Sequence, residues 1–191
     1  MNAQSPADLV SDLYAVTGDI LHKKGEEQEA FAAYDSCLQW KDDNVMALNN
    51  YAYYLSEKGV DLHKAESMSY KTIKAEPNNG TYLDTYAWIL FMEERYADAK
   101  TYIDQALKNR DSTADNSTVI EHAGDIYYMN GMADESVDFW KKAYTGENQT
   151  EVLAWKIKNR QYITEEELKK RNAPKQKPAA KKKSVRKGKK K

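Results

Sequence analysis

Residues Asp84–Ala106, DTYAWILFMEERYADAKTYIDQA, contain two helical patterns joined by a short polar turn. Ala87 stands in the first pattern, Ala99 follows it by 12 residues, and Ala106 follows by another 7. Small residues let two helices approach closely, and bulky neighbours such as Ile103 fill the interface around them. We therefore expect two amphipathic helices that pack against each other.

The same spacing recurs four times along the chain. The first small residues are 34, 35 and 37 residues apart, at Gly18, Ala52, Ala87 and Gly124. Each is followed by two more small residues at the spacings of the third unit or one residue longer, namely Ala30, Ala65, Ala99 and Ser136, then Cys37, Thr72, Ala106 and Ala143. Such repetition predicts a stack of helix pairs in which each pair buries its apolar faces against its neighbours.

This pattern resembles the tetratricopeptide repeat, a helix-turn-helix unit with one small residue in its first helix and two in its second. Pro77 stands where that family ends a second helix. The resemblance covers roughly Ala7–Glu147 and is similar to C-terminal arrays of bacterial tetratricopeptide proteins. It implies an all-α fold, a right-handed superhelical solenoid of antiparallel helix pairs. Four units are expected within residues 6–147, at about 11–44, 45–79, 80–113 and 117–149.

The two ends of the array carry their own signals. Ser5 before Pro6 predicts a helix that begins near Pro6. Residues 150–172 predict a capping helix, whose Val152, Trp155 and Ile157 would cover the last repeat, and a short polar helix. Thr164 and Glu167 have the spacing of a capping box at the start of that polar helix.

Charge is divided unevenly along the chain. The net charge is -1, yet residues 173–191 hold ten Lys or Arg and no acid, which leaves 19 basic and 30 acidic residues elsewhere. A segment with so few apolar residues is expected to be disordered. Its cations either keep the protein in solution or contact phosphates of nucleic acid or an anionic surface. The candidates for such contacts are Lys181, Lys182, Lys183, Arg186 and Lys187.

Several other classes of protein are disfavoured. The single Cys37 cannot form an internal disulfide, and the three histidines lack metal-ligand spacing. No catalytic or phosphate-binding motif occurs. We therefore expect no metal, no cofactor, no small-molecule substrate and no enzymatic activity. The chain has no transmembrane segment or signal peptide, so a cytoplasmic location is expected. The alternative is a periplasmic or membrane-associated location, if the chain is part of a longer exported protein.

The resemblance further implies that the first helices line a concave groove. The matched groove positions are Asn49, Asn50, Tyr53, Asp84, Trp88, Phe91, Glu121, Asp125 and Tyr128. Asparagine amides can bond a peptide backbone at its donors and acceptors, and aromatic rings offer large contact areas. The aromatic residues equally fit helix–helix packing. No Lys or Arg stands at the central groove positions to match the three acids.

The function predicted from these features is a non-catalytic scaffold or adaptor that binds a peptide of a partner protein in the groove. The alternative is a nucleic-acid or ribosome-associated factor that uses the Lys-rich tail for weak, nonspecific contact with phosphates.

Overall fold

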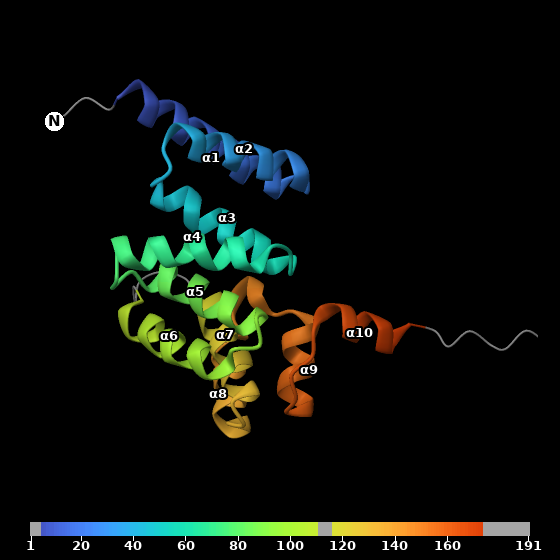
Figure 1. Cartoon of the computed structure of the whole chain (residues 1–191). Helices are drawn as coiled ribbons and strands as arrows, with labels where there is room; N and C mark the ends of the chain where they lie inside the picture. The colour runs from blue at the N-terminus through green and yellow to red at the C-terminus, as the bar shows by residue number, and fades with distance from the viewer. Residues whose placement is uncertain (1–4, 111–115, 174–191) are drawn as a thin grey trace, which may run out of the picture.

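The computed structural model describes residues 5–110 and 116–173. Within these ranges the chain forms ten α-helices and one 3₁₀ helix, and no strand occurs there (Figure 1). The first eight helices are α1 (Pro6–Lys23), α2 (Glu27–Trp40), α3 (Val45–Glu57), α4 (Leu62–Ala75), α5 (Gly80–Met92), α6 (Tyr96–Asn109), α7 (Ser117–Met129) and α8 (Ala133–Ala143). They are followed by η1 (Gly146–Asn148), α9 (Glu151–Asn159) and α10 (Glu165–Asn172).

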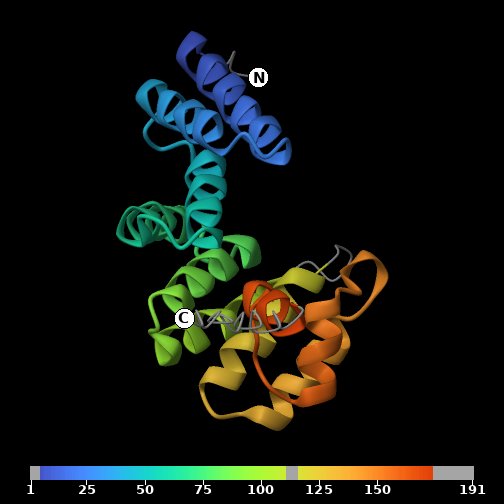
Figure 2. The same ribbon diagram turned by 90° about the vertical axis from the view of Figure 1, so that its right-hand side faces the viewer.

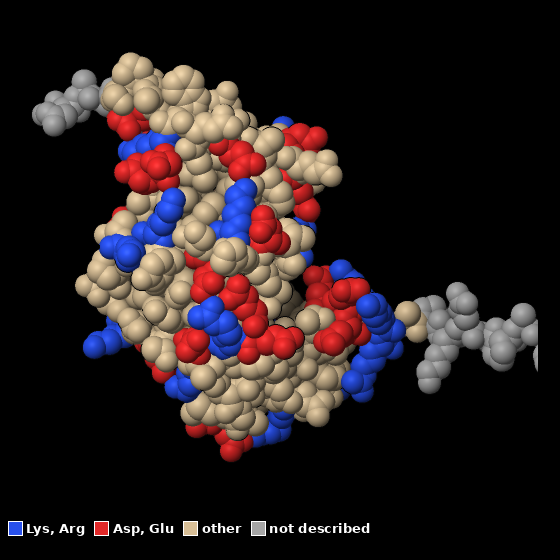
Figure 3. All heavy atoms as spheres, in the orientation of Figure 1, with Lys and Arg blue, Asp and Glu red and all other residues tan. Residues whose placement is uncertain are grey.

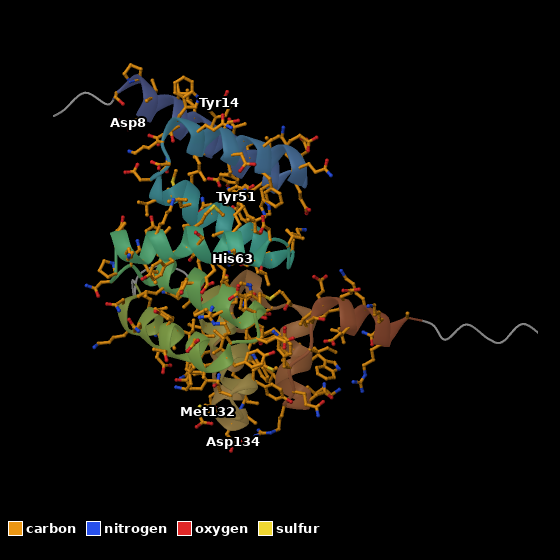
Figure 4. All side chains as sticks on the ribbon, in the orientation of Figure 1. Asp8, Tyr14, Tyr51, His63, Met132 and Asp134 are labelled. Carbon is orange, nitrogen blue, oxygen red and sulfur yellow. The ribbon has the colours of Figure 1, made fainter. Side chains whose placement is uncertain are left out.

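The first eight helices form four antiparallel pairs. Each odd-numbered helix packs most extensively against the helix that follows it, and α4 and α6 also pack against the first helix of the next pair. The first helices α3, α5 and α7 contact one another in turn, so they share one face of the stack. Asp8 in α1 and Asp134 in α8 lie toward opposite ends of this stack (Figure 4). The expected right-handed superhelical solenoid is confirmed.

Small residues lie where the two helices of a pair cross. A Cβ atom added to Gly124 would lie 2.4 Å from Cδ1 of Trp140, and one added to Gly18 would lie 2.8 Å from Cζ of Tyr34. The small residues of the second helices are all fully buried, at Ala30, Ala65, Ala99, Ser136, Cys37, Thr72, Ala106 and Ala143. The predicted crossing points are therefore confirmed.

The turn inside three of the pairs uses a left-handed glycine. Gly25, Gly59 and Gly131 have φ angles of 79°, 63° and 80°, a region that residues with a Cβ atom rarely adopt. In the third pair Glu94 takes this place with a φ of 61°. The backbone N–H of Arg95 then donates to the carbonyl of Leu90 at 2.9 Å, which closes the end of α5.

Two helices begin at the caps that the sequence predicts. Ser5 accepts a hydrogen bond from the backbone N–H of Asp8 at 3.2 Å, with Pro6 as the first residue of α1. Thr164 accepts from the backbone N–H of Glu167 at 3.2 Å, and the Glu167 carboxylate accepts in return from the backbone N–H of Thr164. These side chains satisfy N–H groups that have no partner within the helix.

The helix α9 covers the apolar end of the last repeat, as expected of a capping helix. Leu153 is fully buried with Trp140 and Val137, and Ile157 packs against this cluster. The prediction of Val152 and Trp155 as covering residues is wrong, since both are half-buried and outside that cluster. The Arg171 guanidinium lies 5.2 Å from the Trp155 ring. Figure 2 looks along α10, which projects from the side of the stack near its C-terminal repeats.

Candidate functional site

Two adjoining cavities lie along the face formed by α3, α5 and α7. The smaller has a volume of about 530 Å³, and the larger of about 1220 Å³. Tyr53 and Thr118 line both, so the two cavities adjoin. We call the smaller cavity the amide pocket because six asparagines line it, Asn49, Asn50, Asn78, Asn79, Asn109 and Asn116.

The larger cavity separates the repeats from the C-terminal segment. Its walls come from α3, α5 and α7 on one side and from residues 150–173 on the other. Six carboxylates line it, which is why we call it the acidic cleft: Glu57, Glu121, Asp125, Glu151, Glu165 and Glu166. Figure 3 shows a hollow between the repeats and α10, with acidic side chains on the α10 side.

Asn49 and Asn50 begin a polar chain in the amide pocket. The Asn49 amide donates to Oδ1 of Asn50 at 3.3 Å, and the Asn50 amide donates to Oδ1 of Asp19 at 3.1 Å. Asn49 is buried, and its Oδ1 atom has no hydrogen-bond partner among the described residues. A buried acceptor without a donor costs free energy, so this oxygen favours a ligand or water that brings an N–H or O–H group.

Asp84 forms a buried ion pair with a neighbouring first helix. Nδ1 of His122 lies 3.0 and 3.1 Å from the two carboxylate oxygens of Asp84. Burial disfavours the charged imidazole, but the nearby Asp84 carboxylate more than offsets this and raises the pKa of His122 above its usual value. Asp84 therefore fixes α7 against α5 and still lines the amide pocket.

Trp88 is held between two other rings. Its ring stacks on His122 with centroids 4.1 Å apart and on Phe91 with centroids 4.8 Å apart. Trp88 is 9% exposed, and its indole N–H has no partner among the described residues. Phe91 is buried and also packs edge-on against Tyr162 of the C-terminal segment. Packing against these rings therefore fixes the position of Trp88, which is one of the residues that line the acidic cleft.

Glu121 and Asp125 are paired with a lysine, contrary to the prediction of acids without a matching cation. Nζ of Lys156 donates to Oδ2 of Asp125 at 2.8 Å and to Oε1 of Glu121 at 3.1 Å. Trp140 donates its indole N–H to the other Asp125 oxygen at 2.8 Å. Burial raises the pKa of Asp125, against the opposing attraction of Lys156. The cation comes from α9, outside the repeats, and for that reason matched repeat positions do not reveal it.

The two remaining aromatic positions differ. Tyr53 is half-buried and lines both cavities, and burial together with the Glu57 and Asp84 charges raises the pKa of its hydroxyl. Tyr128 packs beside Trp140, with ring centroids 5.8 Å apart. Neither Tyr128 nor Phe91 is among the residues that line the two cavities. The other seven predicted residues line one cavity or both.

Comparisons with known proteins agree on the architecture. No family model matches the chain. It is 35% identical over 66 residues to the TPR repeat-containing protein PA4667 of Pseudomonas aeruginosa, a match that spans 35% of this chain and 11% of that protein. The fold is similar to that of PilF from Pseudomonas aeruginosa, with a TM-score of 0.68 and 16% identity over 82% of this chain and 69% of that one. It is also similar to YrrB, described as a TPR protein with an unusual peptide-binding site. That match has a TM-score of 0.54 and 18% identity over 77% of this chain and 74% of that one.

Four consecutive helix pairs, their small crossing residues and these similarities give one answer. The chain has the fold of tetratricopeptide-repeat proteins. The region matched by this chain covers only 11% of the length of the curated relative.

Three residues that shape the cleft were not predicted as site residues. Lys156, Tyr162 and Leu168 all come from the segment after the fourth repeat. A signal for Lys156 exists, since it lies three residues after Leu153 and one before Ile157, on the apolar side of α9. A lysine on that side favours a buried acid as partner.

Other predicted sites can be placed only in part. The basic-tail residues Lys181, Lys182, Lys183, Arg186 and Lys187 lie outside the described residues. In the part of the chain that the structure describes, no group of three or more His, Cys, Asp or Glu residues could hold a metal ion. No helix within the described ranges is long and apolar enough to cross a membrane.

Proposed function

We propose that this protein is a non-catalytic scaffold that binds an extended segment of a partner protein along the amide pocket and the acidic cleft. The observation that carries the proposal is a pair of unused polar groups on this face. Oδ1 of Asn49 is a buried acceptor at the amide pocket, and the indole N–H of Trp88 is a buried donor at the acidic cleft. A polypeptide backbone supplies both an N–H and a carbonyl group.

The chemistry of the amide pocket supports a peptide as the ligand. Each asparagine side chain carries both a donor and an acceptor, so a row of them can follow a backbone without reading its sequence. The fold of YrrB supports the same class of ligand, because that protein is described as having a peptide-binding site. The likeness in fold makes a repeat scaffold the expected role, and the ligand class comes from the pocket itself.

A peptide library tests this proposal. Peptides selected on the full chain should bind Asn49→Leu about fivefold more weakly, because the substitution removes an acceptor at nearly constant volume. Asn159→Leu is the matched control, since Asn159 is exposed on α9 and lines neither cavity. Circular dichroism verifies that both variants keep their helices. Selected peptides that bind Asn49→Leu and the parent equally well would place their site elsewhere and contradict the proposal.

The alternative function, phosphate contact through residues 181–187, remains a proposal from the sequence. Binding of this kind should weaken steeply as salt rises, whereas binding in the amide pocket should depend less on salt. A salt titration with duplex DNA as the probe measures the first kind of binding. The same measurement on Asn49→Leu separates the two functions, because this substitution in the amide pocket should leave DNA binding unchanged.

A further inference from the structure

The acidic cleft carries an excess of negative charge. Six carboxylates and three ammonium groups line it. Lys156 is committed to Glu121 and Asp125, and its side chain is 4% exposed. The other two ammonium groups also have partners, Lys169 with Glu165 at 2.5 Å and Lys58 with Glu27, which lies outside the cleft.

Three of the exposed carboxylates stand on opposite walls. Glu57 comes from the end of α3, and Glu165 and Glu166 come from the first turn of α10. All three side chains are exposed. The salt bridges of Glu165 and Glu166 to Lys169 and Lys170 lie along the α10 surface. Such exposed pairs contribute little to stability and exchange readily for another cation.

An independent observation, the unused indole N–H of Trp88, points to a ligand in the same cleft. His122 and Phe91 cover the two faces of the ring, so Trp88 cannot hold a cation against either face. Indole nitrogen is a donor only, and it therefore requires an acceptor from the ligand. Trp88 is 9% exposed, which makes an unmade hydrogen bond costly.

Part of the remaining lining of the cleft is apolar. Met92 and Trp88 lie on the repeat side, and Val152, Ile163 and Leu168 lie on the C-terminal side. A fitting ligand combines a carbonyl acceptor, positive charge and aliphatic surface. An extended peptide rich in Lys or Arg has all three, since the stems of these side chains cover apolar surface while their charged ends reach carboxylates.

Building on the proposed function, we propose that the acidic cleft selects a basic segment of the partner protein, which passes between α10 and the first helices α3 and α5. A backbone carbonyl of this segment accepts the indole N–H of Trp88. Its Lys or Arg side chains pair with Glu57 on one wall and with Glu165 and Glu166 on the other. The asparagines of the amide pocket bind the backbone of the partner segment, and the carboxylates of the acidic cleft select a segment with positive charge.

Fluorescence anisotropy with the full chain tests the proposal. The probe is a short fluorescein-labelled peptide of alternating Lys and Ala, with a Glu and Ala peptide of equal length for comparison. The basic probe should bind and the acidic probe should not. Trp88→Phe keeps an aromatic ring and removes the N–H, and it should weaken binding about fivefold at both low and raised salt. The double variant Glu165→Gln/Glu166→Gln should weaken binding about threefold at low salt only.

Two control variants separate the cleft from the general negative charge of the protein. Trp155→Phe changes a tryptophan that does not line the cleft. Glu135→Gln/Asp138→Asn removes the same charge from α8, also away from the cleft. Both should bind the basic probe like the parent. Equal weakening by the α8 and α10 double variants, or unchanged binding by Trp88→Phe, would overturn the proposal.

The outcome also distinguishes this inference from the proposed function. One outcome is that library peptides bind Asn49→Leu more weakly, carry no excess of Lys or Arg, and bind Trp88→Phe as well as the parent. This outcome would support the proposed scaffold function and refute the basic partner segment. The opposite outcome is that peptides bind Asn49→Leu like the parent but bind Trp88→Phe and the α10 double variant more weakly. It would refute the amide pocket as the peptide site and support the acidic cleft. A basic probe whose binding is insensitive to every cleft variant refutes the cleft as its site.

Discussion

In both the first and the fourth repeat, a glycine in the first helix lies against a buried aromatic ring of the second helix. An aspartate follows each glycine and accepts a hydrogen bond from that ring: Asp19 from the Tyr34 hydroxyl, and Asp125 from the Trp140 indole. The internal packing of the two repeats is therefore alike.

The two repeats differ in what lies beyond them. On the outer side of α1, Leu9, Leu13, Val16 and Ile20 are between 49% and 60% exposed. Tyr14 also reaches the surface of α1 (Figure 4). At the other end, α9 buries Leu153 against Trp140 and sends Lys156 to Asp125. Two repeats with the same internal packing thus form different ends of the stack. The apolar side of α1 is exposed, which we call the open end, and the fourth repeat is covered by α9, which we call the closed end.

The largest expected effect comes from removing the cation at the closed end. Lys156→Met leaves Asp125 buried without its partner, which should lower the free energy of unfolding by about 3–5 kcal/mol. Lys58→Met is the control at the open half, since the Lys58–Glu27 pair lies at the surface and should contribute little stability. Urea denaturation measures both. Similar losses in the two variants would show that α9 is not anchored through Lys156.

Alanine at the two glycines compares the internal packing directly. Gly124→Ala should destabilise by about 1–3 kcal/mol, because its Cβ would overlap Trp140 and α9 holds that ring in place. Gly18→Ala should cost less, since its Cβ would lie 2.8 Å from Tyr34 at the open end, where α1 can move outward. Thermal unfolding followed by circular dichroism gives both values. A larger loss for Gly18→Ala would reverse the comparison.

The free energy of unfolding should depend on pH through His122, which lies in the C-terminal half of the stack. The folded pKa of His122 is raised above 6.5, so its pairing with Asp84 adds stability that is complete below about pH 6.5 and is lost as pH rises through the folded pKa. In the first repeat the matching position is Val16, which cannot titrate. Unfolding free energies measured across this pH range should fall in the parent and change less in His122→Asn. Parallel curves would exclude His122 as the cause.

The smallest effect is expected on the outer side of α1. Leu13→Gln and Ile20→Gln should change the free energy of unfolding by no more than about 0.5 kcal/mol, since both side chains are largely exposed. The position that matches Ile20 in the third and fourth repeats, Ile89 and Ile126, is fully buried. Urea denaturation and sedimentation velocity check the two variants. A loss above about 2 kcal/mol, or a change in mass, would mean that another chain covers α1.

Much of the fold can be predicted from the sequence because its determinants are local and repeated. The spacing of Gly18, Ala30 and Cys37 and its three repetitions mark the helix crossings, and each crossing depends on residues no more than 20 positions apart. The capping residues Ser5 and Thr164 act within one turn of their helices. Seven of the nine predicted groove residues line a cavity for the same reason, since first helices repeat their orientation.

Only the tertiary structure decided how the groove is divided and which polar groups stay unpaired. The Lys156–Asp125 pair joins residues 31 positions apart, and the segment after the fourth repeat has no repeated partner from which its docking could be inferred. Similarly, helical spacing places Trp88 on the concave side but cannot show that His122 and Phe91 cover its two faces. The sequence by itself determined a stack of four helix pairs, because close packing requires small residues at each crossing. The chemistry of the acidic cleft depended on which distant side chains the folded chain brings together, because burial and pairing of charges arise only there.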